Sequence, residues 1–153
     1  MRTSTLLLFG TISLGILFAQ EQEKKIRRAD LPLAVEKTVA TESRGATVKG
    51  FSEEKENGQT YYEAEMMVSG HSKDVLIDNT GAIVEVEEQV AFDSLPANVR
   101  RGLQSKAGSG KILKIESLTK HGKLVAYEVI VEANGKMKEI QVGPDGKALD
   151  HEE

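Results

Sequence analysis

The stretch from Leu95 to Gly146 decides the fold, and it reads LPANVRRGLQSKAGSGKILKIESLTKHGKLVAYEVIVEANGKMKEIQVGPDG. It aligns with the stretch from Leu31 to Gly81, because both begin with Leu-Pro and the later residues stay in step. The offset between matching residues is 64 up to Gly122 and 65 from Tyr127 onward, so the second stretch gains one residue between these positions. A register that survives one insertion predicts a tandem duplication.

Each unit begins with a helical pattern, in which an apolar residue recurs at every fourth position. These residues are Leu31, Val35 and Val39 in the first unit and Leu95, Val99 and Leu103 in the second. The expected helix caps and stops are Asp30 and Gly45 in the first unit, and Asp93 or Ser94 and Gly108 in the second. Small polar residues before an apolar stripe and a glycine after it are typical of helix ends.

After each helix the apolar residues recur at every second position, which predicts strands. Two-residue turns that end in glycine should connect these strands as hairpins, at Asn57-Gly58, Ser69-Gly70, His121-Gly122 and Asn134-Gly135. A last strand is expected from Ile83 to Glu88 in the first unit and from Lys147 to His151 in the second. Ile112 and Leu113 place apolar residues on both faces, so we expect a bulge or an exposed apolar side chain there.

Each unit is therefore a helix followed by three or four antiparallel strands. One unit alone would bury little apolar surface and would leave an open sheet edge. Two units can share a sheet and a layer of helices. The sequence thus predicts an α+β fold with two tandem repeats, residues 30–90 and 91–153, which form one antiparallel sheet with two helices packed on one face.

The residues before the repeats are typical of an exported protein. Arg2 is followed by an uncharged apolar run of 14 residues from Leu6 to Ala19, whereas a membrane-spanning helix needs about 20. We expect residues 1–19 to be a signal peptide that is cleaved between Ala19 and Gln20, and an uncleaved anchor is the alternative. Residues 20–29 are expected to be a flexible leader. The predicted location is secreted or periplasmic, with no membrane span after cleavage.

Composition excludes several functional classes. The chain contains no cysteine, so the fold has neither disulfides nor thiolate metal sites. The formal net charge of −4 comes from mixed signs and offers no basic face for a phosphate backbone. Nucleic acid is therefore not an expected partner.

The repeated motifs resemble the PepSY-like family, in particular its secreted, beta-lactamase-inhibitor-like branch. The resemblance depends on Leu-Pro-x-x-Val at residues 31–35 and 95–99, on Gly-x-x-x-Tyr-Glu at residues 58–63, and on its longer form at residues 122–128. The turns at Gly81 and Gly146 complete the pattern. The resemblance implies an extracytoplasmic binding or inhibitory module, with a role in restraining peptidases proposed for PepSY domains generally. It supplies no catalytic residues, and a shared fold does not transmit the choice of target.

No residue set in the sequence predicts catalysis, a cofactor or a metal site, so we expect a protein that is not an enzyme. His71, His121 and His151 lack the spacing of a zinc site, and no serine has a recognisable histidine partner. The alternative function is a small-ligand or metal-responsive envelope sensor. The acidic residues that suggest it are Glu85, Glu87 and Glu88, with Glu53, Glu54 and Glu56.

The face of the sheet that points away from the helices is the predicted binding surface. Its expected residues are Tyr61, Met67, Leu76, Leu124, Ile130 and Met137, placed between glutamates. Tyrosine and methionine among charged residues are typical of protein-binding surfaces. The leading hypothesis is a non-enzymatic module that binds a protein or peptide in the cell envelope or outside the cell. A peptidase-restraining or other inhibitory role is the activity that this hypothesis includes.

Overall fold

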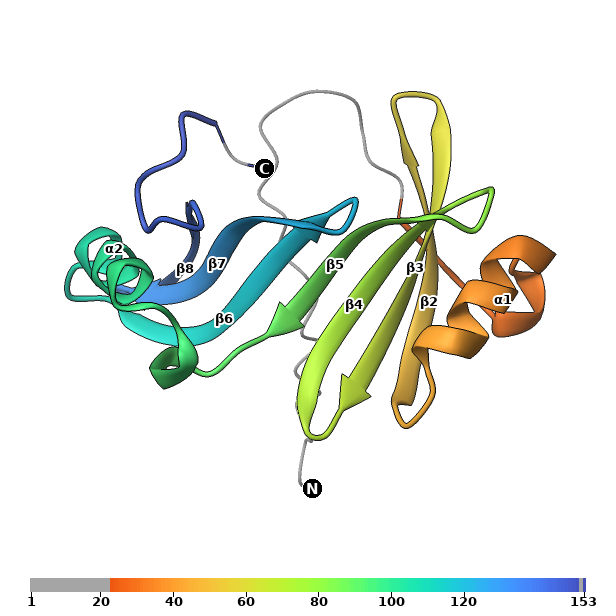
Figure 1. Cartoon of the computed structure of the whole chain (residues 1–153), viewed down its shortest axis with the longest axis horizontal. Coiled ribbons are helices and arrows are strands. Elements are labelled where there is room, and N and C mark those ends of the chain that lie inside the picture. The colour runs from red at the N-terminus through yellow and green to blue at the C-terminus, as the bar shows by residue number, and fades with distance from the viewer. Residues whose placement is uncertain (1–22, 152) are drawn as a thin grey trace, which may run out of the picture.

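A computed structural model of the chain describes residues 23–151 and residue 153. It contains two α-helices, two short 3-10 helices and eight strands (Figure 1). In chain order these are β1 (Lys24–Ile26), η1 (Arg28–Asp30), α1 (Leu33–Glu42), β2 (Thr47–Glu56), β3 (Gln59–Val68), β4 (His71–Asp78), β5 (Ile83–Gln89), η2 (Phe92–Ser94), α2 (Ala97–Ala107), β6 (Lys111–Lys120), β7 (Lys123–Ala133) and β8 (Lys136–Val142). The predicted signal peptide and its cleavage site lie outside the described residues.

All eight strands form one antiparallel sheet whose order follows the chain from β1 to β8. The helices α1 and α2 lie near opposite ends of this sheet (Figure 1). The pairing of β5 with β6 joins an N-terminal half (residues 24–90) to a C-terminal half (residues 91–153). The predicted α+β fold with one antiparallel sheet is confirmed. In the N-terminal half α1 is followed by four strands, β2 to β5, and in the C-terminal half α2 is followed by three, β6 to β8.

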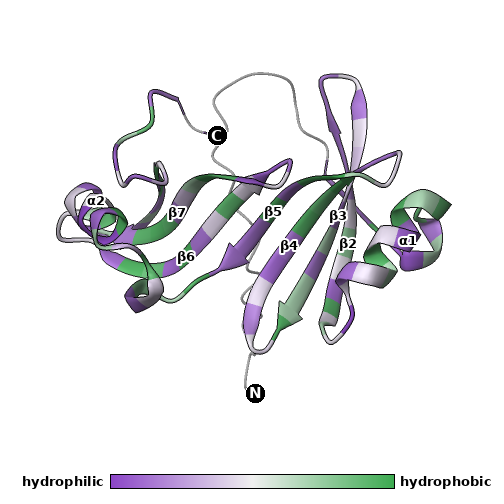
Figure 2. Cartoon of the chain, in the orientation of Figure 1, coloured by the Kyte–Doolittle hydropathy of each residue, from purple (hydrophilic) through white to green (hydrophobic). Residues whose placement is uncertain are grey.

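Each helix buries two residues of its predicted stripe against its own half of the sheet, while Leu31 and Leu95 lie just before the helices, at the ends of η1 and η2. Val35 and Val39 of α1 are buried in a cluster with residues of β2, β3 and β4, and Val99 and Leu103 of α2 are buried in a second cluster with residues of β6, β7 and β8. Because side chains alternate along a strand, the intervening residues point to the other face. This alternation is visible as changing colour along the strands in Figure 2. The molecule therefore has two cores under one continuous sheet.

The four predicted hairpin turns are confirmed. Both central residues have a positive φ in each of them, which is the conformation of a type I′ turn. The non-glycine members are Asn57, Ser69, His121 and Asn134. Type I′ turns match the right-handed twist of the flanking strands, so the turn sequences set the hairpin register.

Matching β-bulges occur in the first hairpin of each half. The register shifts at Lys49 in the N-terminal half and at Leu113 in the C-terminal half, and Leu113 is 41% exposed. This confirms the bulge that the pattern at residues 112–113 predicts. A further bulge occurs only in the second of these hairpins: Leu118 pairs with Ala126 and Thr119 pairs with Leu124, so Val125 has no partner. The inserted residue of the C-terminal half is thus accommodated as a β-bulge.

The helix starts differ from the prediction. The residues that precede α1 and α2 are Pro32 and Pro96, and no side chain caps either helix. Asp30 instead accepts hydrogen bonds from the Arg27 backbone at 3.1 Å and from its guanidinium at 2.8 and 2.9 Å, within η1. A proline before the helix fixes φ and needs no N–H partner, which explains how the helix begins without a polar cap. The predicted ends are closer to the structure, because α1 ends at Glu42 and α2 at Ala107.

The flexible leader and the last strand are two further corrections. Lys24–Ile26 forms β1 at the edge of the sheet, and Ile26 packs on the N-terminal core, so part of residues 20–29 is ordered. The expected strand Ile83 to Glu88 is present as β5, but Lys147 to His151 forms no strand. The C-terminal half therefore lacks a counterpart of β5.

A glycine turn contacts the first turn of each helix. Gly81 has φ +88°, and a Cβ there would lie 2.7 Å from the Ala34 carbonyl oxygen of α1. Gly146 has φ +78°, and a Cβ there would overlap the Asn98 carbonyl of α2. Only glycine satisfies both the backbone conformation and this close approach. These two turns hold each helix to its half of the sheet.

Candidate functional site

The candidate site is the helix-free face, defined by the side chains of Tyr61, Glu63, Glu65 and Met67 on β3 and by the residues that pair with them across the sheet. On β3 these residues alternate with Tyr62, Ala64 and Met66, which pack toward α1. The sheet register places Leu76 opposite Glu63 and Ile130 opposite Glu139. Met137 lies opposite Glu132 in the same register and is 55% exposed.

Five of the six predicted surface residues therefore share the register of this face: Tyr61, Met67, Leu76, Ile130 and Met137. Leu124 does not share it, because the bulge at Val125 lies between Leu124 and the rest of β7. The apolar residues are spread over both halves. They form the margin of a central band that is acidic.

The acidic band consists of seven carboxylates on the helix-free face, contributed by β3 to β7: Glu63, Glu65, Asp74, Glu85, Glu87, Glu116 and Glu128. The backbone pairing brings them together. Glu65 pairs with Asp74 and Asp74 with Glu87 across neighbouring strands, and Glu116 pairs with Glu128. The band crosses the junction between the two halves.

Three of these carboxylates converge at the junction itself. Asp74 of β4, Glu87 of β5 and Glu116 of β6 each have a carboxylate oxygen within 4.8 Å of those of the other two. Glu116 is buried with 4% exposure, and the other two are half-buried. We call these residues the junction carboxylates. Three acidic oxygens at this spacing attract cations of any kind.

The chain supplies cations only to part of the band. Lys25 bonds Glu65 from the β1 edge, Lys114 Nζ lies 2.6 Å from Glu116, and Lys120 Nζ lies 3.7 Å from Glu85. Neutral donors serve two other carboxylates. The Ser52 hydroxyl donates to Glu63 at 2.9 Å, and the Gln141 amide donates to Glu128 at 2.8 Å. Among residues 23–151 and 153, no ion pair reaches Asp74 or Glu87.

Burial and crowding of like charges raise the pKa values of the band. Burial first, and then the neighbouring Glu63, raise the pKa of Asp74 to about 7. Burial, with Glu128 and Glu116 nearby, raises the pKa of Glu87 to about 9. Burial also raises the pKa of Glu63, Glu85 and Glu128. The face therefore holds more carboxylates than its own cations can balance.

The acidic residues expected from the sequence are only partly brought together. Glu85 and Glu87 lie in the band, whereas Glu88 pairs with Lys73 on the helix side of β5. Glu53 pairs with Tyr62, and Glu56 lies at the end of β2, so neither joins the junction carboxylates. The sequence placed Glu63, Glu65 and Glu128 on the outward face, but it missed Asp74 and Glu116, because their meeting with Glu87 depends on the pairing of β5 with both β4 and β6. Polar residues at alternate positions in β4 and β6 were the available signal.

The histidines form no cluster in the described part of the chain. His71 and His121 are exposed at hairpin turns, and His151 Nε2 lies 3.9 Å from Glu153. The carboxylate groupings that could hold a metal contain no histidine; besides the junction carboxylates there is Glu23 with Glu63 and Glu65.

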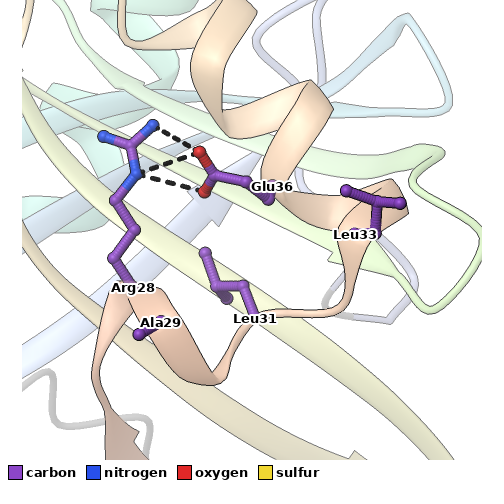
Figure 3. A pocket seen from close by; sticks show the side chains of 5 residues that line it. All are labelled: Arg28, Ala29, Leu31, Leu33 and Glu36. Carbon is purple, nitrogen blue, oxygen red and sulfur yellow. Dashed lines mark hydrogen bonds and ion pairs between the residues drawn. The ribbon is translucent and has the colours of Figure 1, made fainter.

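A hollow on the other side of the molecule carries no comparable chemistry (Figure 3). It measures about 530 Å³ and is lined by Arg28, Ala29, Leu31, Leu33 and Glu36. The guanidinium of Arg28 is already engaged by Glu36, through Nε at 3.1 and 3.2 Å and Nη2 at 2.9 Å. Leu33 is 73% exposed at its rim. The hollow is open and its one cation is paired.

No protein-family model matches the chain, and no curated protein sequence matches it. Solved structures do. A BLIP-like protein from Bacteroides fragilis superposes with a TM-score of 0.59 at 20% identity, over 78% of this chain and 83% of the other. A DUF2874 family protein from Bacteroides ovatus gives a TM-score of 0.61 at 18% identity, over 78% and 85%.

A third structure, from Bacteroides eggerthii and with a suggested periplasmic location, gives a TM-score of 0.64 at 16% identity, over 78% of this chain and 86% of the other. Identities at this level show a common fold and do not transfer a function. The chain thus has a fold like that of BLIP-like and DUF2874 proteins, which is consistent with the resemblance to PepSY-like proteins. None of the described helices is long and apolar enough to cross a membrane.

Proposed function

We propose that this chain is a non-enzymatic binding module of the periplasm that recognises a protein through its helix-free face. The observation that carries the proposal is the composition of that face. Half-buried carboxylates lie at its centre, and Tyr61, Met67, Leu76 and Ile130 lie around them. A polar centre with an apolar margin on a broad sheet fits a protein surface better than it fits an enclosed small molecule.

Two features support the non-enzymatic character and the location. The described residues place no nucleophile beside a histidine, and five of the seven carboxylates of the band are held by lysine, serine or glutamine side chains. One structural neighbour with a suggested periplasmic location, together with the N-terminal pattern of the sequence, favours the periplasm. The name of the BLIP-like neighbour makes inhibition of an enzyme the first activity to test.

A pull-down from an envelope extract, with residues 20–153 as bait, tests the proposal. The triple variant Tyr61→Ala, Leu76→Ala, Ile130→Ala is expected to lose the captured protein. Leu33→Ala is the matched control, because Leu33 is an exposed apolar residue on α1 and away from the helix-free face. Equal capture by the triple variant and the wild type, with both folded, would refute the use of this face.

A cation-responsive sensor is the second candidate, and the junction carboxylates are the observation that favours it. Calcium prefers six to eight oxygen ligands, of which three carboxylates supply only part. Calorimetry with calcium, zinc and copper separates this candidate from the first. If about millimolar metal produces neither heat of binding nor a change in melting temperature, the sensor candidate is refuted, because protein calcium sites have dissociation constants of about 1 mM or lower.

A further inference from the structure

The helix-free face is short of positive charge among the described residues. Seven carboxylates form the acidic band, and of the basic residues between 23 and 151 only Lys25, Lys114 and Lys120 form ion pairs with it. Two of these lysines lie on β6 and the third lies at the β1 edge. The centre, at Asp74 and Glu87, has no ion-pair partner in residues 23–151 and 153. Because the pKa of Glu87 is raised to about 9, this carboxyl keeps its proton at neutral pH, and a cation that binds it displaces that proton. A partner that covers this face must therefore bring cations or bury carboxyl groups that have no partner.

The three lysines show the form in which this face accepts a cation. Each places its ammonium on a carboxylate of the band. Lys114 forms such an ion pair with Glu116, although Glu116 is only 4% exposed. The same contacts are available to a side chain from another protein. Long basic side chains bury their stems along apolar surface while the charged end stays polar.

The apolar margin favours a basic side chain over a hydrated metal ion. Leu76 lies between Glu63 and Glu85 in the sheet register, and Leu118 lies beside Glu87. Leu76 would contact the stem of a lysine or arginine and offers no oxygen to a metal, whereas Leu118 is only 2% exposed and is an apolar neighbour of Glu87 beneath the surface. Glu116 is also already engaged by Lys114, so a metal would have to displace an ion pair to use all three junction carboxylates.

We propose that the partner docks a cationic segment on the helix-free face, with a lysine or arginine side chain on Asp74 and Glu87 at the junction of the two halves. This inference rests on the proposed function, because it specifies the chemistry of the protein that the face binds. The charge complementarity also sets an orientation. The apolar residues of the segment lie toward Met67 and Ile130, and its charge lies over the junction.

Fluorescence anisotropy with labelled hexalysine, against the full mature chain, tests the inference. Hexalysine is expected to bind, and hexaglutamine is not. The double variant Asp74→Asn, Glu87→Gln is expected to weaken binding by at least about tenfold, equivalent to about 1.4 kcal/mol. Glu88→Gln is the matched control: it removes one carboxylate from the same strand, but on the helix side, and should leave hexalysine affinity unchanged.

Salt and calcium complete the experiment. Affinity for hexalysine should fall when the ionic strength rises from about 20 to about 500 mM, because contacts between charges are screened. Equal loss in Glu88→Gln would mean a general charge effect and would overturn the inference. Calcium binding in the absence of hexalysine binding would also overturn it, since the band would then be a metal site.

The partner captured in the pull-down separates this inference from the proposed function. If the apolar triple variant loses that partner while Asp74→Asn, Glu87→Gln retains it, the face binds a protein but not through a cation, and only the inference fails. If neither variant loses the partner, both fail. If the triple variant and the double variant both lose the partner, while Glu88→Gln and Leu33→Ala retain it, the proposed function and the inference are both supported.

Discussion

Both halves of the molecule contain an equivalent turn, at residues 78–82 after β4 and at residues 143–147 after β8, but only the first turn leads into another strand. In the N-terminal half, the Asp78 N–H donates to the Ala82 carbonyl at 2.9 Å. In the C-terminal half, the Gly143 N–H donates to the Lys147 carbonyl at 2.8 Å. After the first turn the chain forms β5, whereas after the second, residues 148–151 form no strand.

This difference indicates that pairing with adjacent strands, more than the turn, determines whether a last strand forms. β5 pairs with β4 on one side and with β6 on the other, and it supplies Ile83 and Val86 to the N-terminal core. The segment after Gly146 follows β8, which is the edge strand of the sheet, so no further described strand is available on its other side. Its residues Ala148 and Leu149 also have lower strand preference than isoleucine and valine. One half thus depends on the other for its last strand.

The halves also differ where each helix meets its glycine turn. In the N-terminal half the Thr38 hydroxyl donates to the Gly81 carbonyl at 2.6 Å. The residue that aligns with Thr38 is Gly102, where a Cβ would overlap the Gly146 carbonyl. The second helix lies too close to its turn for a side chain. One contact is a hydrogen bond and its counterpart is direct packing of two backbones.

Separating the halves should have the largest effect. Residues 92–153 alone would expose the β6 edge that β5 covers, and would keep a single core. We expect this fragment to be largely unfolded or self-associated, while residues 20–153 unfold in one transition. Circular dichroism and sedimentation of both proteins provide the measurement. A stable monomeric fragment, or two transitions in the intact chain, would show that the halves are independent.

Gly102→Ala should be the most harmful single substitution of those considered. Alanine is favoured over glycine inside a helix by about 1 kcal/mol, but the added carbon overlaps a backbone carbonyl that cannot rotate away. We expect a net loss of at least about 2 kcal/mol in the free energy of unfolding, measured with urea. A gain in stability would show that α2 can move away from the turn at Gly146.

Glu87→Gln tests the strand that only the N-terminal half possesses. The folded pKa near 9 exceeds the ordinary value of 4.5, so between these pH values the folded state holds a proton that the unfolded state releases. The free energy of unfolding should therefore fall as the pH rises from about 4.5 to about 9. Glutamine should remove most of that fall, with a gain on the order of 1–2 kcal/mol at about pH 8 after allowance for solvent screening, and no gain at about pH 4.

Urea unfolding of wild type, Glu87→Gln and Glu88→Gln across this pH range provides the measurement. Glu88→Gln should keep the wild-type slope, because its side chain lies on the helix side. Parallel curves for the wild type and Glu87→Gln would mean that Glu87 is ionised normally in the folded protein.

Thr38→Val tests the hydrogen bond that replaces the close backbone packing of the other half. Valine keeps the shape of threonine and leaves the Gly81 carbonyl without its donor, so the free energy of unfolding should fall by about 1 kcal/mol. Thr41→Val is the control, since that exposed hydroxyl bonds only its own helix, at the Lys37 carbonyl. Equal effects of the two substitutions would reflect helix preference rather than the turn contact.

The smallest expected effect concerns an ion pair that the C-terminal half lacks. Lys73 Nζ lies 2.9 Å from Glu42 Oε2, whereas the aligned residues of the other half are Lys138 and Lys106, which carry the same sign. Glu42→Gln should cost about 0.5 kcal/mol, less at high salt. Lys106→Gln should change the free energy of unfolding by less than that. If Lys106→Gln lowers the free energy of unfolding more than Glu42→Gln does, the ion pair is not what distinguishes the two halves here.

Local patterns in the sequence predict most of the fold. The alternation on β3 and β7, the stripes Val35/Val39 and Val99/Leu103, and the positive-φ turns are all local, and all are confirmed. The helix starts were mispredicted because a proline set the backbone where a polar cap was expected. The ordered β1 was missed because Ile26 is a single apolar residue among charges.

The candidate site was harder to predict than the fold. Its apolar margin follows from alternation alone, but the junction carboxylates require the register of β5 against both neighbours. That register includes an extra residue, Val84, between Ile83 and Glu85 on β5, where the pairing with β4 shifts. Alternation within one strand carries no information about such pairing. The strand expected at Lys147 to His151 was mispredicted for a similar reason, because the sequence does not show which strands lie on either side of a segment.

The bulge at Val125 has a consequence for how this chain tolerates changes of length. Pairing on the far side of the bulge, such as Tyr127 with Ser117, matches the pairing of Tyr62 with Glu53 in the other half. The insertion is therefore confined to the distal end of one hairpin, and it shifts neither the core residues nor the acidic band. At that end of the hairpin one residue can be inserted or deleted while every other side chain stays on the same face of the sheet.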